Sequence, residues 1–323
     1  MQDCYDEREE KEKFRDGEDM SIFILLIQKL VVMFILMMMG AFLFKKSLIT
    51  EEGSKCFGNF LIYLVLPCVI VNSFLSERTV QRMMALLLCL CLSVLILCLS
   101  IMVSRLLFQK DPIGHFAAAF SNPGFFGIPL ISAVLGEEAV FYVAPFIACL
   151  NILQWTYGVS VLKEEKVKVC LKNIICSPFM IGFRIGVLLF LSQVTIPTVA
   201  RSVISMTANL NTPVAMLVSG VYLAKVDLKA MLKNRELYRI SAVRLLIIPA
   251  LGALVLSLLP EYLYDVKMCL FIAAACPVGS NVAVYAQLHK KDYAYAVQTV
   301  VLSTLLSAFS IPVLVLAIQN VWH

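Results

Sequence analysis

The segment AAAFSNPGFFGIPL at 117–130 places helix-breaking residues inside an apolar run. These residues are Asn122, Pro123, Gly124, Gly127 and Pro129. Pro123 has no backbone N–H, and the residue before a proline, here Asn122, is driven toward extended geometry, so a helix should stop and restart at this point. The restarting helix presents free N–H groups and the positive end of its dipole, which suits an anion.

A second apolar run, AAACPVGSNVAVY, contains Pro277, Gly279 and Asn281 and offers the same interruption. Backbone groups freed inside a membrane are tolerated only where they are buried in protein or line a wet cavity. A kink for packing would explain a single proline, but two interruptions that both contain Asn favour one shared site at the middle of the membrane. The residues named in these two runs are therefore our candidates for substrate binding.

The elements that position these residues are predicted to be membrane helices. Of the 323 residues, 60% are hydrophobic and 15% are charged, and the mean hydropathy is +0.87, which is far from the balance of a soluble domain. Ten apolar stretches are each close to the roughly 20 residues that cross a bilayer, and they are continuous rather than alternating, which argues against a β-barrel. The sequence predicts an all-α protein with spans at 21–44, 56–75, 83–108, 115–135, 139–162, 174–196, 207–224, 240–259, 266–288 and 294–319.

The distribution of Lys and Arg predicts the orientation. The connections after the odd-numbered spans hold sixteen of these residues, whereas the connections after the even-numbered spans hold four. The positive-inside rule places the first set in the cytoplasm. We therefore predict a multi-pass protein of the cell membrane with both termini outside the cytoplasm.

The charged N-terminal tail, 1–20, differs from the rest of the chain. Its first nineteen residues include nine acidic and four basic ones and no apolar core of a secretory signal. Composition favours a disordered, solvated tail. The alternative is that translation begins at Met20, directly before the first span.

The helices are predicted to form an internal repeat. The second span contains YLVLPCVIVNSFL and the seventh contains NLNTPVAMLVSGVYL; aligning their prolines also aligns Ser73 with Ser219. Aligning the prolines of the fourth and ninth spans also aligns Gly127 with Asn281. Five spans separate each pair, an odd number, so the second copy is inverted relative to the first. The predicted units are a first five-helix repeat, a cytoplasmic loop and a second five-helix repeat, at 21–162, 163–173 and 174–323.

Three cations lie more than three residues inside a predicted span, and none has an acidic residue deep in a span to pair with. Such a cation needs snorkelling, water, carbonyl groups or an anionic ligand. Arg244 lies near the cytoplasmic end of its span, so we expect it to snorkel. Lys29 and Arg184 are further candidates for holding substrate.

Neutral polar side chains supply candidates of lower rank. Asn151, Gln154, Tyr157 and Ser160 recur at a spacing of three and form one stripe of the fifth span. Asn72 and Ser73 follow the proline of the second span, and Ser219 has the related place in the seventh. Groups of this kind also bond helices to one another.

No catalytic or metal-binding set can be assembled from the spans. The cysteines have no paired CxxC spacing, and the histidines are His115, His289 and His323, far apart in the sequence. We expect no metal cofactor and no enzyme activity.

The segments SNPGFFGIPL, LPCVIVNSFL and CPVGSNVAVYA, together with the ten-span layout, resemble the auxin efflux carrier family of secondary transporters, in its bacterial malate or malonate permease branch. The resemblance covers the chain from about Met20. It implies two inverted repeats in a fold similar to that of the bile-acid sodium symporters, with a scaffold domain and a transport domain. It also makes Asn122 with Pro123, and Pro277 with its neighbours, the crossover residues.

This sequence departs from the family in two places. The loop Lys163 to Asn173 is short compared with many plant carriers, and Ser177 stands before Pro178 where an Asn is expected. Neither difference touches the crossovers. Arg184 has no assigned role in the family.

The resemblance implies a permease or efflux carrier for a small organic anion, either a dicarboxylate or an auxin-like acid. We expect alternating access, in which the crossover-bearing domain moves against helices 1, 2, 6 and 7. Symport with sodium or protons, as in bile-acid symporters, and an anion channel are the alternatives left open. The expected partners are the anion and the lipid bilayer, with a homodimer left open and no nucleic acid.

Overall fold

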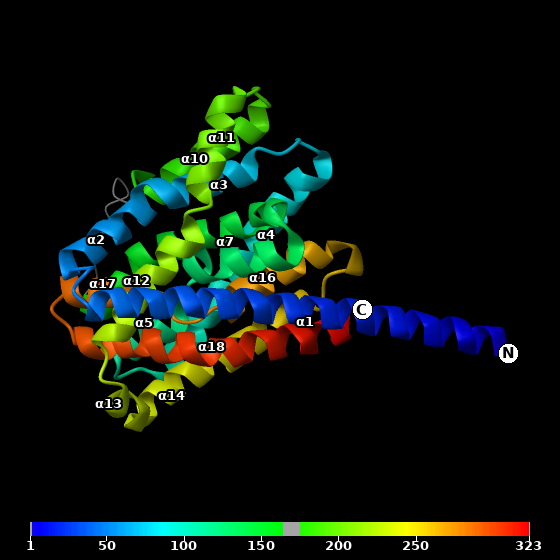
Figure 1. Ribbon diagram of the computed structural model, residues 1–323. Helices are drawn as coiled ribbons and strands as arrows, with labels where there is room; N and C mark the ends of the chain where they lie inside the picture. Colours follow the sequence, from blue (N-terminus) through cyan, green and yellow to red (C-terminus); the bar gives the residue numbers. More distant parts are fainter. Residues whose placement is uncertain (1, 164–174, 323) are drawn as a thin grey trace.

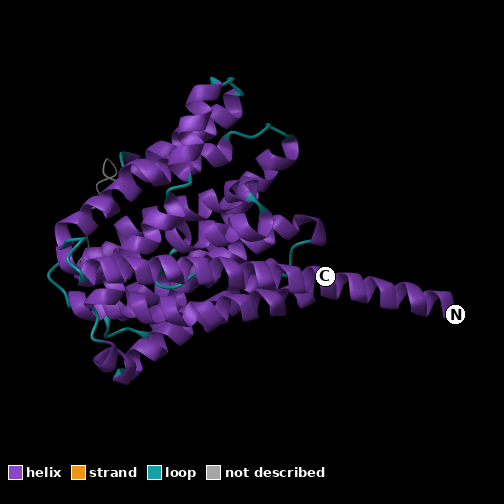
Figure 2. Cartoon of the chain, viewed as in Figure 1, coloured by secondary structure: helices purple, strands orange, loops and turns teal. Residues whose placement is uncertain are grey.

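The computed structural model describes residues 2–163 and 175–322, with side chains from Ile22 onward. Within these ranges every element is helical and no strand forms beyond one isolated bridge (Figures 1 and 2). The predicted loop at 163–173 lies almost wholly outside the described residues, as does the first residue of the sixth predicted span. The backbone of the charged tail continues the first helix from Gln2, where composition favoured an irregular segment.

The helices follow one another with short connections. The first part of the chain contains α1 (Gln2–Lys45), α2 (Glu51–Phe60), η1 (Leu61–Val65), α3 (Leu66–Phe74), α4 (Val80–Leu107), α5 (Pro112–Ala119), η2 (Pro123–Gly127), α6 (Ile128–Leu135), η3 (Glu137–Ala139), α7 (Val140–Leu153), η4 (Gln154–Gly158) and α8 (Val159–Lys163). The second part contains α10 (Pro178–Ser192), α11 (Thr198–Ala208), α12 (Asn211–Lys225), α13 (Leu228–Lys233), α14 (Arg235–Ala242), η5 (Val243–Ile247), α15 (Ile248–Leu256), η6 (Glu261–Leu263), α16 (Tyr264–Ala275), α17 (Asn281–Leu288) and α18 (Tyr293–Trp322).

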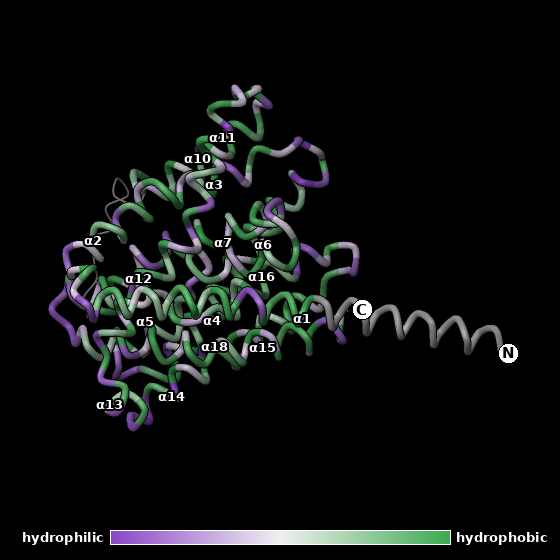
Figure 3. The backbone as a smooth tube through the Cα atoms, in the orientation of Figure 1, coloured by the Kyte–Doolittle hydropathy of each residue, from purple (hydrophilic) through white to green (hydrophobic). Residues whose placement is uncertain are grey.

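Six helical stretches of the described chain are long and apolar enough to cross a membrane. They are Ile22–Lys45, Glu51–Phe74, Val80–Leu107, Glu137–Lys163, Arg235–Leu256 and Tyr293–Trp322. Figure 3 shows apolar residues along these helices and polar residues gathered at the connections between them. The protein is therefore a multi-pass membrane protein, and the count of ten spans stays a prediction.

The remaining predicted spans are shorter or interrupted in the structure. The sixth and seventh correspond to α10 and α12, each of 15 residues. Between them lies α11, in place of the loop expected from the sequence. Its residues Arg201, Ser202 and Ser205 lower the local hydropathy, so an apolar-run criterion does not detect this helix.

Three of the spans contain a π-helical turn directly before a proline. The turns η1, η2 and η5 each end two residues before Pro67, Pro129 and Pro249 respectively. A proline inside a helix removes one backbone donor and its ring crowds the preceding turn, and a wider turn accommodates both effects. These prolines therefore loosen the helices without ending them.

Helices from the first and second parts of the chain pack closely against one another at two places. Helix α1 packs against α12, and α3 packs against α10 and α11 (Figure 1). At the first contact, a Cβ on Gly220 would overlap the Met37 carbonyl oxygen and lie 2.7 Å from the backbone nitrogen of Ala41. A Cβ on Gly40 would in turn overlap the Leu217 carbonyl oxygen. Glycine at both positions is what lets the two backbones touch.

The fourth predicted span is interrupted between α5 and η2. Phe120 is extended, with φ −115° and ψ 117°, and Asn122 has φ −113° and ψ 61°. Pro123 begins the restarted helix, and the Asn122 Oδ1 accepts a hydrogen bond from the Phe125 N–H at 3.4 Å. The interruption predicted from Pro123 is thus present, but Gly127 and Pro129 lie within the resumed helix.

The ninth predicted span is interrupted in the same manner. Helix α16 ends at Ala275, Cys276 has φ −59° and ψ 150°, and helix α17 resumes at Asn281. Pro277 and Gly279 both lie in the unwound stretch and are buried.

The two unwound stretches cross and hydrogen-bond to each other. Ser121 and Val278 form an antiparallel bridge. The Asn122 N–H donates to the Pro277 carbonyl at 2.9 Å, and the Gly279 N–H donates to the Phe120 carbonyl at 3.0 Å. This exchange is symmetrical about the bridge, so each strand satisfies the backbone groups that its own helix has lost.

The bridge pairs the two segments differently from the proline alignment of the predicted repeat, which stays a prediction. Matching the two prolines placed Gly127 against Asn281, at an offset of 154 residues, whereas Ser121 and Val278 at the bridge are 157 residues apart. The difference is three residues. It arises because Pro123 follows the bridge residue in its segment while Pro277 precedes the bridge residue in the other.

A buried arginine joins the two helices that end at the crossing. Arg244 of η5 is 1% exposed, so the expectation that it snorkels is wrong. Its Nη1 donates to the Ala118 and Ala119 carbonyls of α5 at 3.1 and 3.3 Å, and its Nη2 donates to the Ala274 carbonyl of α16. The guanidinium therefore satisfies carbonyl groups at two helix C-termini, where the helix dipole favours a cation.

The glycine contact between α1 and α12 predicts a stability difference. Gly220→Ala should lower the free energy of unfolding by about 2 kcal/mol or more, because the new methyl group meets backbone that cannot rotate away. Gly58→Ala, where a Cβ meets nothing within 4 Å, is the matched control and should not destabilise. Thermal unfolding of the detergent-purified variants measures both. Equal midpoints for the two would contradict the close approach.

The crossing predicts a second stability effect. Arg244→Leu should destabilise the protein by about 3 kcal/mol or more, because it leaves buried carbonyls of α5 and α16 without a donor. Exposed Arg235→Leu is the control and should stay within about 0.5 kcal/mol of the unaltered protein. The comparison uses the same unfolding measurement, and an Arg244→Leu variant as stable as the control would rule out the capping role.

Candidate substrate-binding site

A cavity of about 350 Å³ lies between α1, α3, α6 and α12, and η3 borders it. Its apolar wall includes Val69, Ile128 and Pro129. Its polar and charged side chains are Lys29, Asn72, Ser73, Ser132, Glu137, Asn209, Asn211 and Thr212. A small ionised molecule would meet both charge and hydrogen-bonding groups in this space.

Lys29 is the one cation at this cavity. Its side chain is half-buried, and it makes no hydrogen bond or ion pair with any residue that the structure describes. Glu137, at the start of η3, is the one carboxylate there and is exposed. Lys29 is therefore free to attract an anion that enters the cavity.

Asn211 connects the cavity to the crossing. Its side chain is 3% exposed, and its Nδ2 donates to the Gly124 carbonyl of η2 at 3.0 Å. Its Oδ1 is buried without a hydrogen-bond partner in the described chain. Sequence reasoning missed this residue, although the signal was present in NLNTP, where the asparagine begins a helix two residues before Pro213.

Two further cavities lead away from the first. One, of about 580 Å³, shares Asn72, Ser73 and Glu137 with it. The next, of about 570 Å³, shares Glu138 and Arg201 with the second. Residues of α3 border all three cavities, and the shared residues make each cavity the neighbour of the next.

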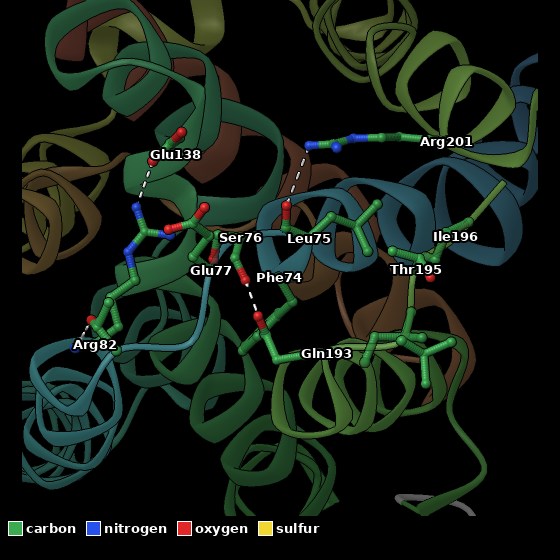
Figure 4. Close-up of a pocket in the computed structure, with 13 residues that line it drawn as sticks. Phe74, Leu75, Ser76, Glu77, Arg82, Glu138, Gln193, Thr195, Ile196 and Arg201 are labelled. Atoms are coloured by element: carbon green, nitrogen blue, oxygen red, sulfur yellow. Dashed lines mark hydrogen bonds and ion pairs between the residues drawn. The ribbon is translucent and has the colours of Figure 1, made fainter. Parts of the chain in front are cut away.

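The outermost of these cavities has polar walls (Figure 4). Arg82 and Glu138 form an ion pair of 2.6 Å on one side. On the other, the Arg201 Nη2 donates to the Leu75 carbonyl at 3.4 Å, and the Gln193 Nε2 donates to the Ser76 carbonyl at 3.3 Å. Ionic and hydrogen-bonding groups therefore line part of the outermost cavity, beside apolar residues such as Phe74 and Ile196.

The structure brings only part of the predicted set to the cavity. Lys29, Asn72, Ser73 and Pro129 border it. The Ser73 hydroxyl already donates to the Ile70 carbonyl at 2.8 Å, so it remains an acceptor for a ligand. The candidates Pro123, Gly124, Pro277 and Gly279 are buried at the crossing instead, while Asn122 and Asn281 are half-buried there.

The polar stripe of the fifth span meets the crossing at one residue. The Asn281 Nδ2 donates to the Gln154 Oε1 at 2.7 Å, and the Gln154 Nε2 is buried without a partner in the part of the chain described. Asn151 bonds to the Ile147 carbonyl of its own helix at 2.9 Å. The Tyr157 hydroxyl oxygen lies 3.3 Å from the His115 Nε2, within hydrogen-bond distance. None of these residues borders the three cavities.

Two other candidates lie apart from the site. Arg184 is exposed on α10 and donates to the Ile175 and Met180 carbonyls at 2.7 and 3.3 Å. The Ser219 hydroxyl donates to the Ala215 carbonyl at 2.8 Å. Neither borders the cavities described above, so the structure brings neither residue to the site.

Comparison with known proteins gives the same class of protein as the architecture. Residues 25–315 match the family described as "Membrane transport protein". A protein of Rhizobium meliloti (strain 1021) named "Putative malonate transporter" is 26% identical to the chain over 286 residues, which are 83% of this chain and 88% of that protein.

The matched family spans most of the chain and includes both crossing segments and the cavity. The chain therefore belongs to this membrane transport protein family, that of the auxin efflux carriers, and is a transporter rather than an enzyme.

Proposed function

We propose that the protein is a secondary transporter that moves a small organic anion of the dicarboxylate class across the cell membrane by alternating access. The single observation that supports this most directly is the cavity beside the crossing, where Lys29 has no ion pair with any described residue. Placing a charge within a membrane protein costs at least ~2.5 kcal/mol on insertion scales, so an unpaired lysine there suggests an anionic ligand.

The size and the chemistry of the cavity favour a compact substrate. A volume of about 350 Å³ suits a dicarboxylate of a few carbons better than a ligand of drug size. Asn72, Ser73 and Asn211 can hydrogen-bond to a second polar end of such an anion. The name of the Rhizobium meliloti relative, a malonate transporter, agrees with this class.

The helix contacts support two inverted repeats at 21–162 and 174–323. Helix α1 meets α12 at Gly40 and Gly220, and α10 meets α3 where a Cβ on Gly186 would lie 2.8 Å from the Phe74 Cδ2. The offset that aligns the prolines of the second and seventh predicted spans also sets Gly40 on Gly186 and Phe74 on Gly220. Exchanging the repeats thus maps one contact onto the other, as inverted symmetry requires.

Alternating access would involve two groups of helices. The scaffold group consists of α1, α2, α3, α10, α11 and α12, and the crossing group consists of α4 to α8 and α14 to α18. The cavity lies between them, because Lys29 and Asn211 belong to the first and Pro129 and Ser132 to the second. A bound anion that contacts both groups can link their relative position to its own binding.

The orientation predicted from Lys and Arg assigns the sides of the membrane. The connections that border the outer cavities, near Leu75, Glu138 and Gln193, belong to the predicted extracytoplasmic set. The structure then corresponds to a state open to the outside.

Replacing the lysine tests the proposed site. Lys29→Gln should raise the KM for malonate about tenfold or more in proteoliposomes, because it removes the charge that attracts the carboxylate, and Lys29→Arg should retain most of the activity. Exposed Lys110→Gln is the control. Counterflow of labelled malonate is the readout, since a channel gives none. An unchanged KM for malonate in Lys29→Gln would show that Lys29 does not bind the substrate.

Accessibility tests alternating access itself. A cysteine at half-buried Asn281, in a background without the natural cysteines, should react with an impermeant thiol reagent from either side of the membrane, depending on substrate and conditions. The crossing group exposes this position to each side in turn. Reaction from one side under every condition would contradict the mechanism.

A further inference from the structure

The Asn211 Oδ1, a buried acceptor without a donor in the described chain, indicates the protonation state of the substrate. Building on the proposed function, we infer that Asn211 accepts a hydrogen bond from the substrate, and that the transported species is a dicarboxylate carrying one proton, such as hydrogen malonate. The anion itself then brings the proton, and no carboxylate of the protein has to relay it.

The geometry assigns the two ends of the Asn211 amide. A carbonyl cannot donate, so the end that contacts the Gly124 carbonyl at 3.0 Å must be the NH₂ group. The Oδ1 is therefore the remaining end of the amide, and it is buried without a partner among the described residues. A buried acceptor without a donor costs about 1–3 kcal/mol, which a donor in the adjoining cavity would recover.

The charges around the cavity define what that donor can be. Lys29 of α1 and Glu137 of η3 are the titratable residues that border it. The parts of α3, α6, α11 and α12 that border it, and the residues between α11 and α12, contribute neutral side chains. Lys29 favours a carboxylate, while Asn211 Oδ1 requires an N–H or O–H group.

A half-protonated dicarboxylate satisfies both requirements at once. Its ionised end pairs with Lys29, and its carboxylic acid O–H donates to Asn211 Oδ1. A fully ionised dicarboxylate would instead place an acceptor against an acceptor, near the Glu137 carboxylate as well. The site therefore selects the monoanion over the dianion.

The proton balance follows from this selection. The substrate binds with one proton on its second carboxyl group, crosses with it and releases it when the acid ionises on the far side. Each transported dicarboxylate thus moves one proton in the same direction and a net single negative charge. The hydrogen bond from Asn211 to the Gly124 carbonyl also connects α12 of the scaffold group to η2 of the crossing group. The substrate would therefore bind next to a hydrogen bond between the two groups of helices.

Binding measurements on the full-length purified protein test the inference with three probes. Malonate affinity should fall about tenfold per pH unit above the second pKa of malonic acid, because the competent species is depleted. Malonamate, whose amide always donates, should bind with little dependence on pH over the same range. Monomethyl malonate, which has no donor, should bind about tenfold more weakly than malonamate.

A variant separates the hydrogen bond from the rest of the site. Asn211→Ala should abolish the preference for malonamate over monomethyl malonate, while exposed Asn320→Ala should keep it. Equal binding of the two probes by the unaltered protein, or malonate affinity that does not change across that pKa, overturns the inference but leaves the proposed function standing. If none of the three carboxylates binds at any pH, the proposed function itself fails.

Discussion

Backbone amides cannot be left without partners inside a bilayer, and the crossing of residues 120–122 with residues 276–279 is where this chain meets that constraint. Each unwound segment lacks a helical partner because a proline sits in or beside it. Each then finds its partner in the other segment, through the reciprocal bonds around Ser121 and Val278. Both interruptions are buried, and each would lose backbone partners without the other, so the two halves of the chain depend on one another at the crossing.

The rest of the architecture follows from this pairing. The helices that enter the crossing end with unsatisfied carbonyls, and Arg244 supplies their donors. The helix that resumes after the first interruption carries Gly124 toward Asn211, and its next turns reach the cavity at Pro129 and Ser132. The candidate site is thus placed beside the crossing rather than within it, on the side where the scaffold helices come near.

The sequence predicts the fold where local chemistry determines it. Pro123 and Pro277 reveal both interruptions, because loss of an N–H is a property of the residue itself. The prolines do not predict which residues of the two interrupted segments pair with each other, because a proline can lie on either side of the bridge. Arg244 was misread because its distance from a helix end says nothing of carbonyls brought to it by α5 and α16. The helix α11 was missed because its polar residues hide it from a hydropathy criterion.

The candidate site was predictable only in part, for a similar reason. Lys29 was identified from its depth in an apolar helix, and Asn72 and Ser73 from their place after the proline of the second span; all three border the cavity. Asn211 and Glu137 lie near helix ends, where polar residues are common, and the position of Asn211 two residues before Pro213 is a weak signal by itself. Their significance comes from contact with segments distant in the sequence, which one sequence without structure does not reveal. The roles of all these residues in binding remain proposals.

The location of Arg244 has an electrical consequence. Its guanidinium donates hydrogen bonds to three carbonyls on two helices of the crossing group. Any displacement of that group along the membrane normal therefore carries a full elementary charge through part of the transmembrane field. A complete crossing of that field by one charge is worth about 2.3 kcal/mol per 100 mV. Under the proposed alternating access, the resting voltage of the cell would thus bias which side the empty carrier faces, before any solute is bound.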